Sequence, residues 1–387
     1  MKIALGMIVK SLDSDTELLR FIDNAEKFGH KIDAVLVAYA LKYDRRVADR
    51  LMRRVPFFAI DIRNPHFCLE RFRDLGISDD ATSVLLKCPI DPQTHRGAVP
   101  YGFNRTVVLI EAILRGADIF VFVDSDVFPS FLEKTPDGSK IEEFDFFGAH
   151  LEQLKTGSQV TTAEYSGYNI LPPASFDGMD DLLHGLQKAD MLGYWHSSET
   201  HRCLTYQQPD REPKPCTKIL GGNTAMKLSA FSKLPPFFSS YYTVGNEMFL
   251  SRGEDTVLGD EIGRNSMICT DTGLNPLHDT YKDYPVEPDL RRDRAAQERF
   301  FYACTGWLGR NPFLNYIRKA DLRSVKGFQR DRLERGLRAL AEYTSNPRYL
   351  CVMENFEVSW ENLGRYADEY ERVIAAWDEF RERGGFA

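Results

Sequence analysis

Short apolar runs alternate with helical patterns through the first 126 residues of this chain. The stretch after the first run carries Leu18, Ile22 and Ala25 on one helical stripe and ends at Gly29, a residue type that commonly terminates helices. Strands that alternate with helices predict a parallel, doubly wound sheet with right-handed crossovers. We therefore expect an α/β fold in which a mostly parallel, twisted sheet is flanked by helices. The expected strands cover residues 3–9, 34–39, 57–62, 119–123 and 142–149; further helices are expected over 45–54 and 105–115, with a helix or loop near 69–75.

Two carboxylates follow directly on the apolar run at 119–123, where the sequence reads Asp124-Ser125-Asp126. The carboxyl ends of parallel strands are where open α/β sheets bind ligands. Carboxylates at such a place are costly unless something cationic lies between them. A divalent metal with hard oxygen ligands, itself bound to a phosphate, meets that need. The alternative is a helix cap or an Asx-turn, for which Asp is equally suited.

The composition argues against several classes of protein. The chain has 387 residues and a formal net charge of −8, which argues against a broad nucleic-acid-binding surface. Its seven cysteines are scattered without a CxxC pair, so we expect a reducing compartment and a cytoplasmic protein. The N-terminal segment lacks a small-residue cleavage site, and no stretch approaches the ~20 apolar residues of a membrane span. We therefore do not expect an integral membrane protein.

The second half of the chain is expected to be irregular at first and helical at its end. Residues 151–217 contain clusters of Gly, Pro and Ser around a helix near 182–192, and we interpret them as an insertion over the sheet edge. Pro285 and Pro288 mark a boundary, beyond which the sequence looks helical. A stripe at helical spacing near the end predicts core packing: Tyr366, Tyr370, Val373, Ile374, Trp377 and Phe380.

Three later segments resemble loops that line a site. Residues 219–226, ILGGNTAM, contain two glycines before Asn, which let the backbone approach a ligand closely or form a simple turn. Residues 253–262, GEDTVLGDEI, place acidic side chains before an apolar helix, where Asp255 or Thr256 is also a natural cap. Residues 277–281, LHDTY, contain His278. A lone His is more often structural, but a neutral imidazole near two carboxylates is a natural third metal ligand.

In order and rough spacing, the series FVFVDSDVFP, LGGNTAM, GEDTVLGDEI and HDTY resembles the motifs of GT-A-type nucleotide-sugar glycosyltransferases, from the first strand to about Tyr281. The resemblance implies the Rossmann-like GT-A sheet, a helical C-terminal extension, and an enzyme that transfers a sugar, expected to be a hexose. It also implies a catalytic domain over 1–284, with a nucleotide-binding half 1–126 and an acceptor half 127–284. The helical region would cover 285–387.

The resemblance also implies a metal and donor site. Asp124 and Asp126 would hold Mn²⁺ or Mg²⁺ against the donor diphosphate, and His278 would complete the metal site. Asp124 would lie near the ribose, and Ser125 next to it would also bind the donor. The chemistry agrees, because a nucleoside diphosphate that leaves develops negative charge and a divalent cation neutralises it.

For the sugar side, the resemblance implies a loop and a base. Gly221, Gly222 and Asn223 would line the donor sugar and the acceptor. Glu254 and Asp255 would form the acidic pair, in which Asp255 is the expected base. An acceptor hydroxyl that attacks the anomeric carbon needs a carboxylate to take its proton.

The nucleotide is expected to lie against the N-terminal half. By analogy, the end of the first strand supplies contacts, here Val9 and Lys10. The segment 95–105 contains glycines and two arginines that suit a diphosphate or a base. Arg105 is the better candidate because it lies at a helix start, and a solvent-facing arginine is the alternative.

Several alternatives stay open on the sequence alone. A retaining enzyme needs no base at Asp255, although the intact acidic pair favours inversion. A nucleotidyltransferase normally has a Gly-rich loop after the first strand, where this chain reads KSLDSDTE. A non-catalytic nucleotide-sugar-binding protein would bind the donor without turnover. The expected partners are a UDP- or GDP-sugar and an unidentified acceptor, which could be a saccharide, a lipid-linked glycan, a small molecule or a protein. No nucleic acid is expected, and an oligomer is possible.

Overall fold

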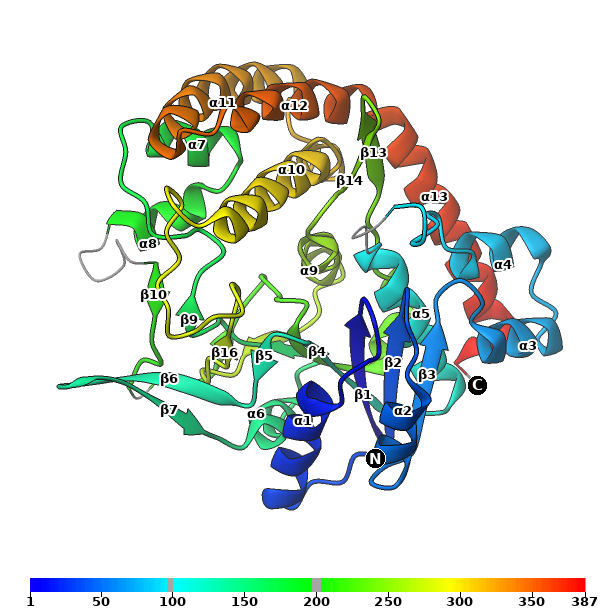
Figure 1. Ribbon diagram of the computed structural model, residues 1–387. Coiled ribbons are helices and arrows are strands. Elements are labelled where there is room, and N and C mark those ends of the chain that lie inside the picture. Colours follow the sequence, from blue (N-terminus) through cyan, green and yellow to red (C-terminus); the bar gives the residue numbers. More distant parts are fainter. Residues whose placement is uncertain (96–99, 197–202, 210, 387) are drawn as a thin grey trace.

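One large sheet forms the centre of the computed structural model, which describes residues 1–95, 100–196, 203–209 and 211–386. Its eight strands are β1 Ile3–Val9, β2 Ala34–Tyr39, β3 Phe57–Asp61, β4 Ile119–Asp124, β8 Val160–Thr162, β11 Lys214–Pro215, β12 Asn223–Lys227 and β15 Cys269–Asp271. They lie in the order β11-β15-β8-β12-β4-β1-β2-β3 (Figure 1). The pairs β3-β2, β2-β1, β1-β4 and β8-β15 are parallel, and the other three are antiparallel.

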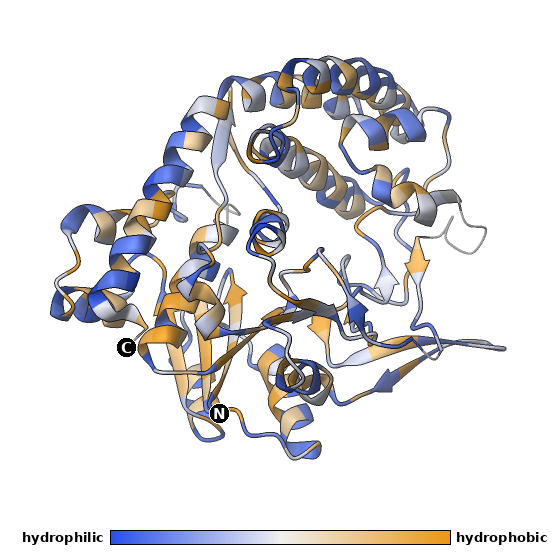
Figure 2. Ribbon diagram, turned by 180° about the vertical axis from the view of Figure 1, so that it is seen from behind, coloured by the Kyte–Doolittle hydropathy of each residue, from blue (hydrophilic) through white to orange (hydrophobic). Residues whose placement is uncertain are grey.

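The parallel half of the sheet follows the alternation in the sequence. Its strands are buried on both faces because helices cover both sides, which explains their nearly continuous apolar composition. Figure 2 shows this apolar character concentrated in the strands, while the helices carry hydrophobic and hydrophilic residues side by side. The helices of this half are α1 Thr16–Lys27, α2 Arg45–Met52, α3 His66–Asp74, α4 Asp79–Leu86 and α5 Tyr101–Leu114. The expected fold class, a mostly parallel sheet flanked by helices with a helical C-terminal region, is confirmed.

One expected strand is wrong. Residues 142–149 do not form a strand: a hairpin of β6 Ser130–Thr135 and β7 Gly138–Glu143 ends there and helix α6 Phe146–Lys155 begins. The carboxylate of Asp145 caps α6 by accepting the backbone N–H of Gly148 at 2.8 Å. One side of α6 is buried in the core, where it places Phe146, Phe147 and Leu151. The adjacent aromatic residues resemble a strand locally, but their continuation has helical spacing.

Residues 151–217 contribute to the large sheet as well as to its surroundings. Strand β8 lies between β12 and β15, and β11 forms the edge next to β15. Near the helix expected at 182–192 the structure has α7 Met179–Gly185, a 3-10 turn at Ala189–Met191 and α8 Leu192–His196. A small two-stranded sheet pairs β9 Gly167–Tyr168 with β10 Leu204–Thr205.

The polypeptide after residue 285 is helical, as expected. Its helices are α10 Arg294–Ile317, α11 Leu322–Thr344, α12 Val352–Glu361 and α13 Leu363–Phe380. In Figure 1, α11 and α12 arch over α7 and α10, and α13 descends to α3 and α4 beside the parallel half of the sheet. Tyr366, Trp377 and Phe380 of the expected stripe are fully buried. Among the described residues, no helix is long and apolar enough to cross a membrane.

Candidate active site

A cavity of about 280 Å³ opens where the carboxyl end of β4 meets the later segments of the chain. Its walls come from the end of β4, the loop before β12, the start of helix α9 Glu254–Arg264, strand β16 Leu277–His278 and the middle of α10. All four motif segments therefore reach one place. This is the end of the sheet at which parallel α/β folds bind ligands.

The Asp-Ser-Asp segment and the histidine are brought together by a short pair of strands. β5 Val127–Phe128 pairs antiparallel with β16, and His278 lies opposite Val127 in this pairing. The Nε2 atom of His278 lies 3.3 Å from Oδ1 of Asp126, while its Nδ1 atom is 3.0 Å from Thr280 Oγ1. The ring of Tyr165 packs against the imidazole with 4.5 Å between ring centroids.

Asp126 is ionised in this surrounding. Burial opposes its charge, but His278 and Arg299 outweigh burial and hold the pKa of the carboxyl well below its usual range. Arg299 of α10 approaches it with Nη2 3.4 Å from Oδ2. The helical C-terminal region therefore reaches the metal-binding motif expected from the sequence, a contact that motif spacing did not reveal.

Arg105 connects three of the four motif segments. Its side chain is 3% exposed, and its Nη2 atom is 2.9 Å from Oδ1 of Asp124. Its Nε atom is 2.9 Å from Oε1 of Glu254, and its Nη1 donates to the carbonyl of Gly221. The guanidinium also lies over the ring of Phe122 at 4.3 Å. Arg105, expected to contact the nucleotide, is thus occupied by protein groups and holds the motif segments in place.

The two glycines of the loop before β12 are explained by Arg105 and Asp124. A Cβ atom at Gly221 would lie 2.5 Å from Nη1 of Arg105, and one at Gly222 would lie 2.2 Å from Oδ2 of Asp124. At both positions, the side chain of Arg105 or Asp124 packs so closely on the backbone that only glycine fits. Asn223, by contrast, is fully buried, where its Nδ2 donates to the Ala163 carbonyl. Its side chain does not reach the cavity.

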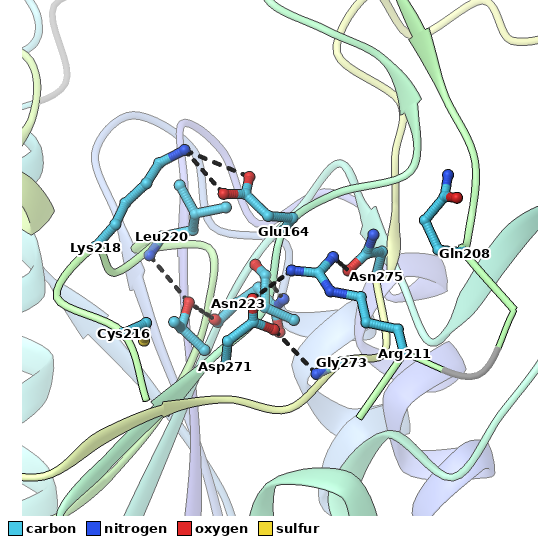
Figure 3. A network of polar contacts seen from close by, with 12 residues as sticks. Glu164, Gln208, Arg211, Cys216, Lys218, Leu220, Asn223, Asp271, Gly273 and Asn275 are labelled. Carbon is cyan, nitrogen blue, oxygen red and sulfur yellow. Dashed lines mark hydrogen bonds and ion pairs between the residues drawn. The ribbon is translucent and has the colours of Figure 1, made fainter. Parts of the chain in front are cut away.

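The loop is also tied down from its other side, as Figure 3 shows. The N–H of Leu220 donates to Thr162 Oγ1 at 3.0 Å, and the ammonium of Lys218 lies 3.1 Å from Glu164 (Figure 3). Next to this network, Arg211 pairs with Asp271 of β15 (Figure 3). The loop that carries the glycines is therefore fixed to β8 as well as to Arg105.

The two acidic residues at the start of α9 lie in different surroundings. Glu254 is buried against Arg105; burial raises the pKa of its carboxyl, and the arginine opposes that rise. Asp255 lines the cavity and is only partly buried. Its Oδ2 accepts the N–H of Gly221 at 3.1 Å, and its Oδ1 accepts the N–H of Thr256 at 2.7 Å. Asp255 is thus oriented by backbone donors and has no basic partner within ion-pair distance among the described residues.

A metal site was expected at Asp124, Asp126 and His278, and the structure brings two of these three residues together. Within the described ranges, no three His, Cys, Asp or Glu side chains are grouped closely enough to hold a metal ion. Asp126 and His278 do lie together, whereas Asp124 is paired with Arg105. A carboxylate and an imidazole suit Mn²⁺ or Mg²⁺ when phosphate oxygens and water supply the remaining ligands. The residues present therefore fit half of a divalent-cation site.

The other residues expected to bind the nucleotide lie outside the cavity lining. Val9 ends β1, and Lys10 follows it with an exposed side chain and a carbonyl that accepts the N–H of Leu41 at 2.9 Å. Ser125 lies in the turn between β4 and β5. Residues 96–99 of the segment 95–105 lie outside the described residues. Whether these groups contact a nucleotide stays a prediction.

Several cavity residues were not expected from the sequence. They come from the segment before β12 and from α10, and the clearest are Tyr165, Lys188, Asp190, Trp307 and Arg310. The only available signal was the presence of arginines in an otherwise apolar helix, which does not distinguish a cavity-lining residue from a surface one.

The comparisons with known proteins give a structural likeness only. No protein-family model matches the sequence, and no curated protein matches it. Among solved structures, glucosyl-3-phosphoglycerate synthase from Mycobacterium tuberculosis with Mn²⁺, UDP and phosphoglyceric acid is 13% identical, covering 79% of this chain and 76% of that one, with a TM-score of 0.38. The same synthase with Mn²⁺ and UDP-glucose is 13% identical over 79% and 78% of the two chains, with a TM-score of 0.35. A likeness of this degree does not assign an activity to this chain.

Proposed function

We propose that this protein is a metal-dependent glycosyltransferase that moves a sugar from a UDP- or GDP-sugar to an acceptor hydroxyl. The observation that carries the proposal is the meeting of Asp124, Gly221 and Glu254 at one buried guanidinium, beside the Asp126–His278 pair. Segments about 100 to 150 residues apart in the sequence thereby form a single cavity. If each motif served only as a local turn or a helix cap, these segments would not need to meet in one cavity.

The groups in the cavity form two sets, one proposed to act on the leaving nucleoside diphosphate and one on the attacking acceptor hydroxyl. Asp126 and His278, with Asp124 beside them, would hold Mn²⁺ or Mg²⁺, which when bound neutralises the charge of the leaving nucleoside diphosphate. Asp255 is the proposed base, and each of its oxygens keeps a lone pair for an acceptor hydroxyl beside the backbone N–H that it accepts. Glu254 is proposed to orient Arg105 rather than to move a proton, because it is buried against the guanidinium.

The stereochemical outcome follows from the role of Asp255. A base that activates the acceptor on the face opposite the leaving group gives inversion, which the oriented carboxylate favours. Proton NMR of the first-formed product, before it mutarotates, reads the anomeric configuration directly. Retention would remove Asp255 as the base while leaving the donor site intact.

The donor site is tested by calorimetry of UDP and GDP with and without MnCl₂, together with a thermal-shift screen of nucleotide sugars. We expect one nucleotide to bind much more tightly with Mn²⁺, and Asp126→Ala to abolish this gain. Asp137→Ala, in the exposed turn between β6 and β7, is the matched control and should behave as the unmodified protein. Binding of neither nucleotide would refute the proposal, whereas donor binding without transfer or hydrolysis would indicate a non-catalytic sugar-nucleotide-binding protein.

A further inference from the structure

Arg310 is a buried cation that lines the cavity without a carboxylate partner. Its side chain is 7% exposed, and its Nε atom has no hydrogen-bond acceptor. Its Nη2 donates to Asn311 Oδ1 at 2.9 Å, and its Nη1 makes a long contact of 3.3 Å with Thr256 Oγ1. No carboxylate in the described part of the chain lies within ion-pair distance of it; burial lowers the pKa of the guanidinium, and the more distant charge of Asp255 only partly opposes this. A buried charge in this state is expensive unless an anion joins it.

The backbone at Gly253 fixes the position of this guanidinium. Gly253 has φ +100°, and a Cβ atom there would lie 2.6 Å from Cδ and 2.8 Å from Nη1 of Arg310. The arginine side chain therefore packs closely against the turn that starts α9. The next residues along that turn are Glu254 and Asp255, so Arg310 is held beside the proposed base.

A second cation, Lys188, lines the same cavity. Its side chain is 16% exposed, and its ammonium lies 5.4 Å from the ring centroid of Trp307, a neighbour of Arg310 on α10. Its one ion-pair partner among the described residues, Asp190, is 52% exposed at 3.1 Å, so solvent screens this pair. Burial lowers the pKa of Lys188; Asp190 opposes this shift, and the positive charge of Arg310 adds to it. Two cations that repel each other in one cavity favour an anion between them.

We propose that Arg310 and Lys188 form a subsite for an oxyanion, phosphate or carboxylate, on the acceptor, so that the acceptor is a small anionic molecule with a free hydroxyl. A planar guanidinium suits two oxygens of such a group, and the ammonium supplies a point charge. The subsite lies on the Asp255 side of the cavity, whereas the half-site for the donor's metal is at Asp126 and His278. The assignment to the acceptor rests on the proposed function; the presence of an oxyanion site does not.

Calorimetry with inorganic phosphate tests the subsite on the full chain, first alone and then saturated with UDP and Mn²⁺. We expect phosphate to bind both forms, and Arg310→Gln and Lys188→Gln each to weaken it about tenfold, which corresponds to ~1.4 kcal/mol. The control is Arg318→Gln, an exposed arginine at the end of α10 that pairs with Asp260 and should leave phosphate affinity unchanged. Arg310→Lys keeps the charge and should retain part of the affinity, which separates loss of the subsite from loss of folding.

The outcomes separate this inference from the proposed function. Unchanged phosphate affinity in Arg310→Gln, or loss of phosphate binding on adding UDP, would overturn the subsite. So would an equal loss of UDP affinity in Arg310→Gln, because the arginine would then serve the donor. If UDP and GDP fail to bind while phosphate binding still depends on Arg310, the glycosyltransferase proposal fails and the oxyanion site stands. Transfer to glucose 6-phosphate, glucuronate and glucose then shows which oxyanion is used, and preference for neutral glucose contradicts an anionic acceptor.

Discussion

The two walls of the cavity differ in how their charges are balanced. On the wall at the strand ends, each carboxylate has a cation: Asp124 and Glu254 share Arg105, and Asp126 has His278 and Arg299. On the wall formed by α10, Arg310 has none. The carboxylates of the first wall are paired before any ligand arrives, so the protein alone can set their positions. The second wall has a buried cation without a direct ion-pair partner, which is typical of a surface whose partner comes from solution.

The largest effect is expected from breaking the balance of the first wall. Arg105→Met leaves buried Glu254 and partly buried Asp124 without their shared cation. We expect the free energy of unfolding to fall by about 3–5 kcal/mol, the usual cost of breaking a buried ion pair. Urea denaturation measures it, with Arg330→Met as the control, because Arg330 forms an exposed pair with Glu357, and such pairs contribute little to stability. A loss in Arg105→Met as small as that in the control would contradict the stabilising role of Arg105.

The next effect is expected at Asp255, the proposed base in the lining of the cavity. Asp255→Asn keeps the shape of the side chain but removes the proposed base, so turnover should fall about 10²–10⁴-fold with little change in donor affinity. Asp260→Asn is the matched control on the same helix, because Asp260 pairs with Arg318 away from the cavity lining. Steady-state kinetics with donor calorimetry measure both quantities. Near-normal turnover would exclude Asp255 as the base.

A smaller effect is expected at the loop that supports the first wall. In Gly222→Ala, the new methyl group overlaps the carboxylate of Asp124, which must move; we expect a loss of about 1–3 kcal/mol in unfolding free energy. Gly263→Ala on α9 has no atom within 4 Å of the new methyl group and should stabilise the protein by roughly 0.5–1 kcal/mol. Thermal unfolding of the two variants would give opposite shifts. Equal shifts would mean that the loop adapts without disturbing Asp124.

The smallest effect is expected in the pH dependence of stability, through His150, which contacts Asn223 next to the glycine loop. Burial lowers the pKa of His150 to about 4, and its ring hydrogen-bonds with Asn223 Oδ1 and Thr161 Oγ1. The unfolded chain, with a pKa near 6.5, binds the proton more readily, so this contribution is present above about pH 6.5 and is lost as the pH falls toward 4. We expect about 2 kcal/mol between pH 7 and pH 5, seen as a slope that His150→Gln removes. An unchanged slope in this variant would contradict the assignment.

The sequence placed Asp124 and Asp126 correctly because they lie at the end of a strand, whereas the pairing of Arg105 and Arg299 with carboxylates was not predicted. Ile119–Val123 is apolar on both faces and short, so its strand and the position of Asp124 after it follow from local pattern. The strand expected at 142–149 was wrong because Asp145 caps a helix whose buried side becomes visible only over several turns. Arg310 was missed because its role depends on a turn at Gly253, nearly 60 residues earlier. The spacing of residues along a buried helix does not show which of its arginines or lysines faces a cavity.

The last helix limits how this protein can move. α13 returns from the helical region to the parallel half of the sheet, where the carboxylate of Glu379 accepts the N–H of Ser78 at 2.6 Å. Phe380 stacks on Phe72 with 5.1 Å between centroids, and the indole of Trp377 donates to the Leu234 carbonyl at 3.0 Å. A hinge between the helical region and the sheet would have to break this attachment. We therefore expect the distance between α10 and the strand ends to change little when ligands enter or leave the cavity.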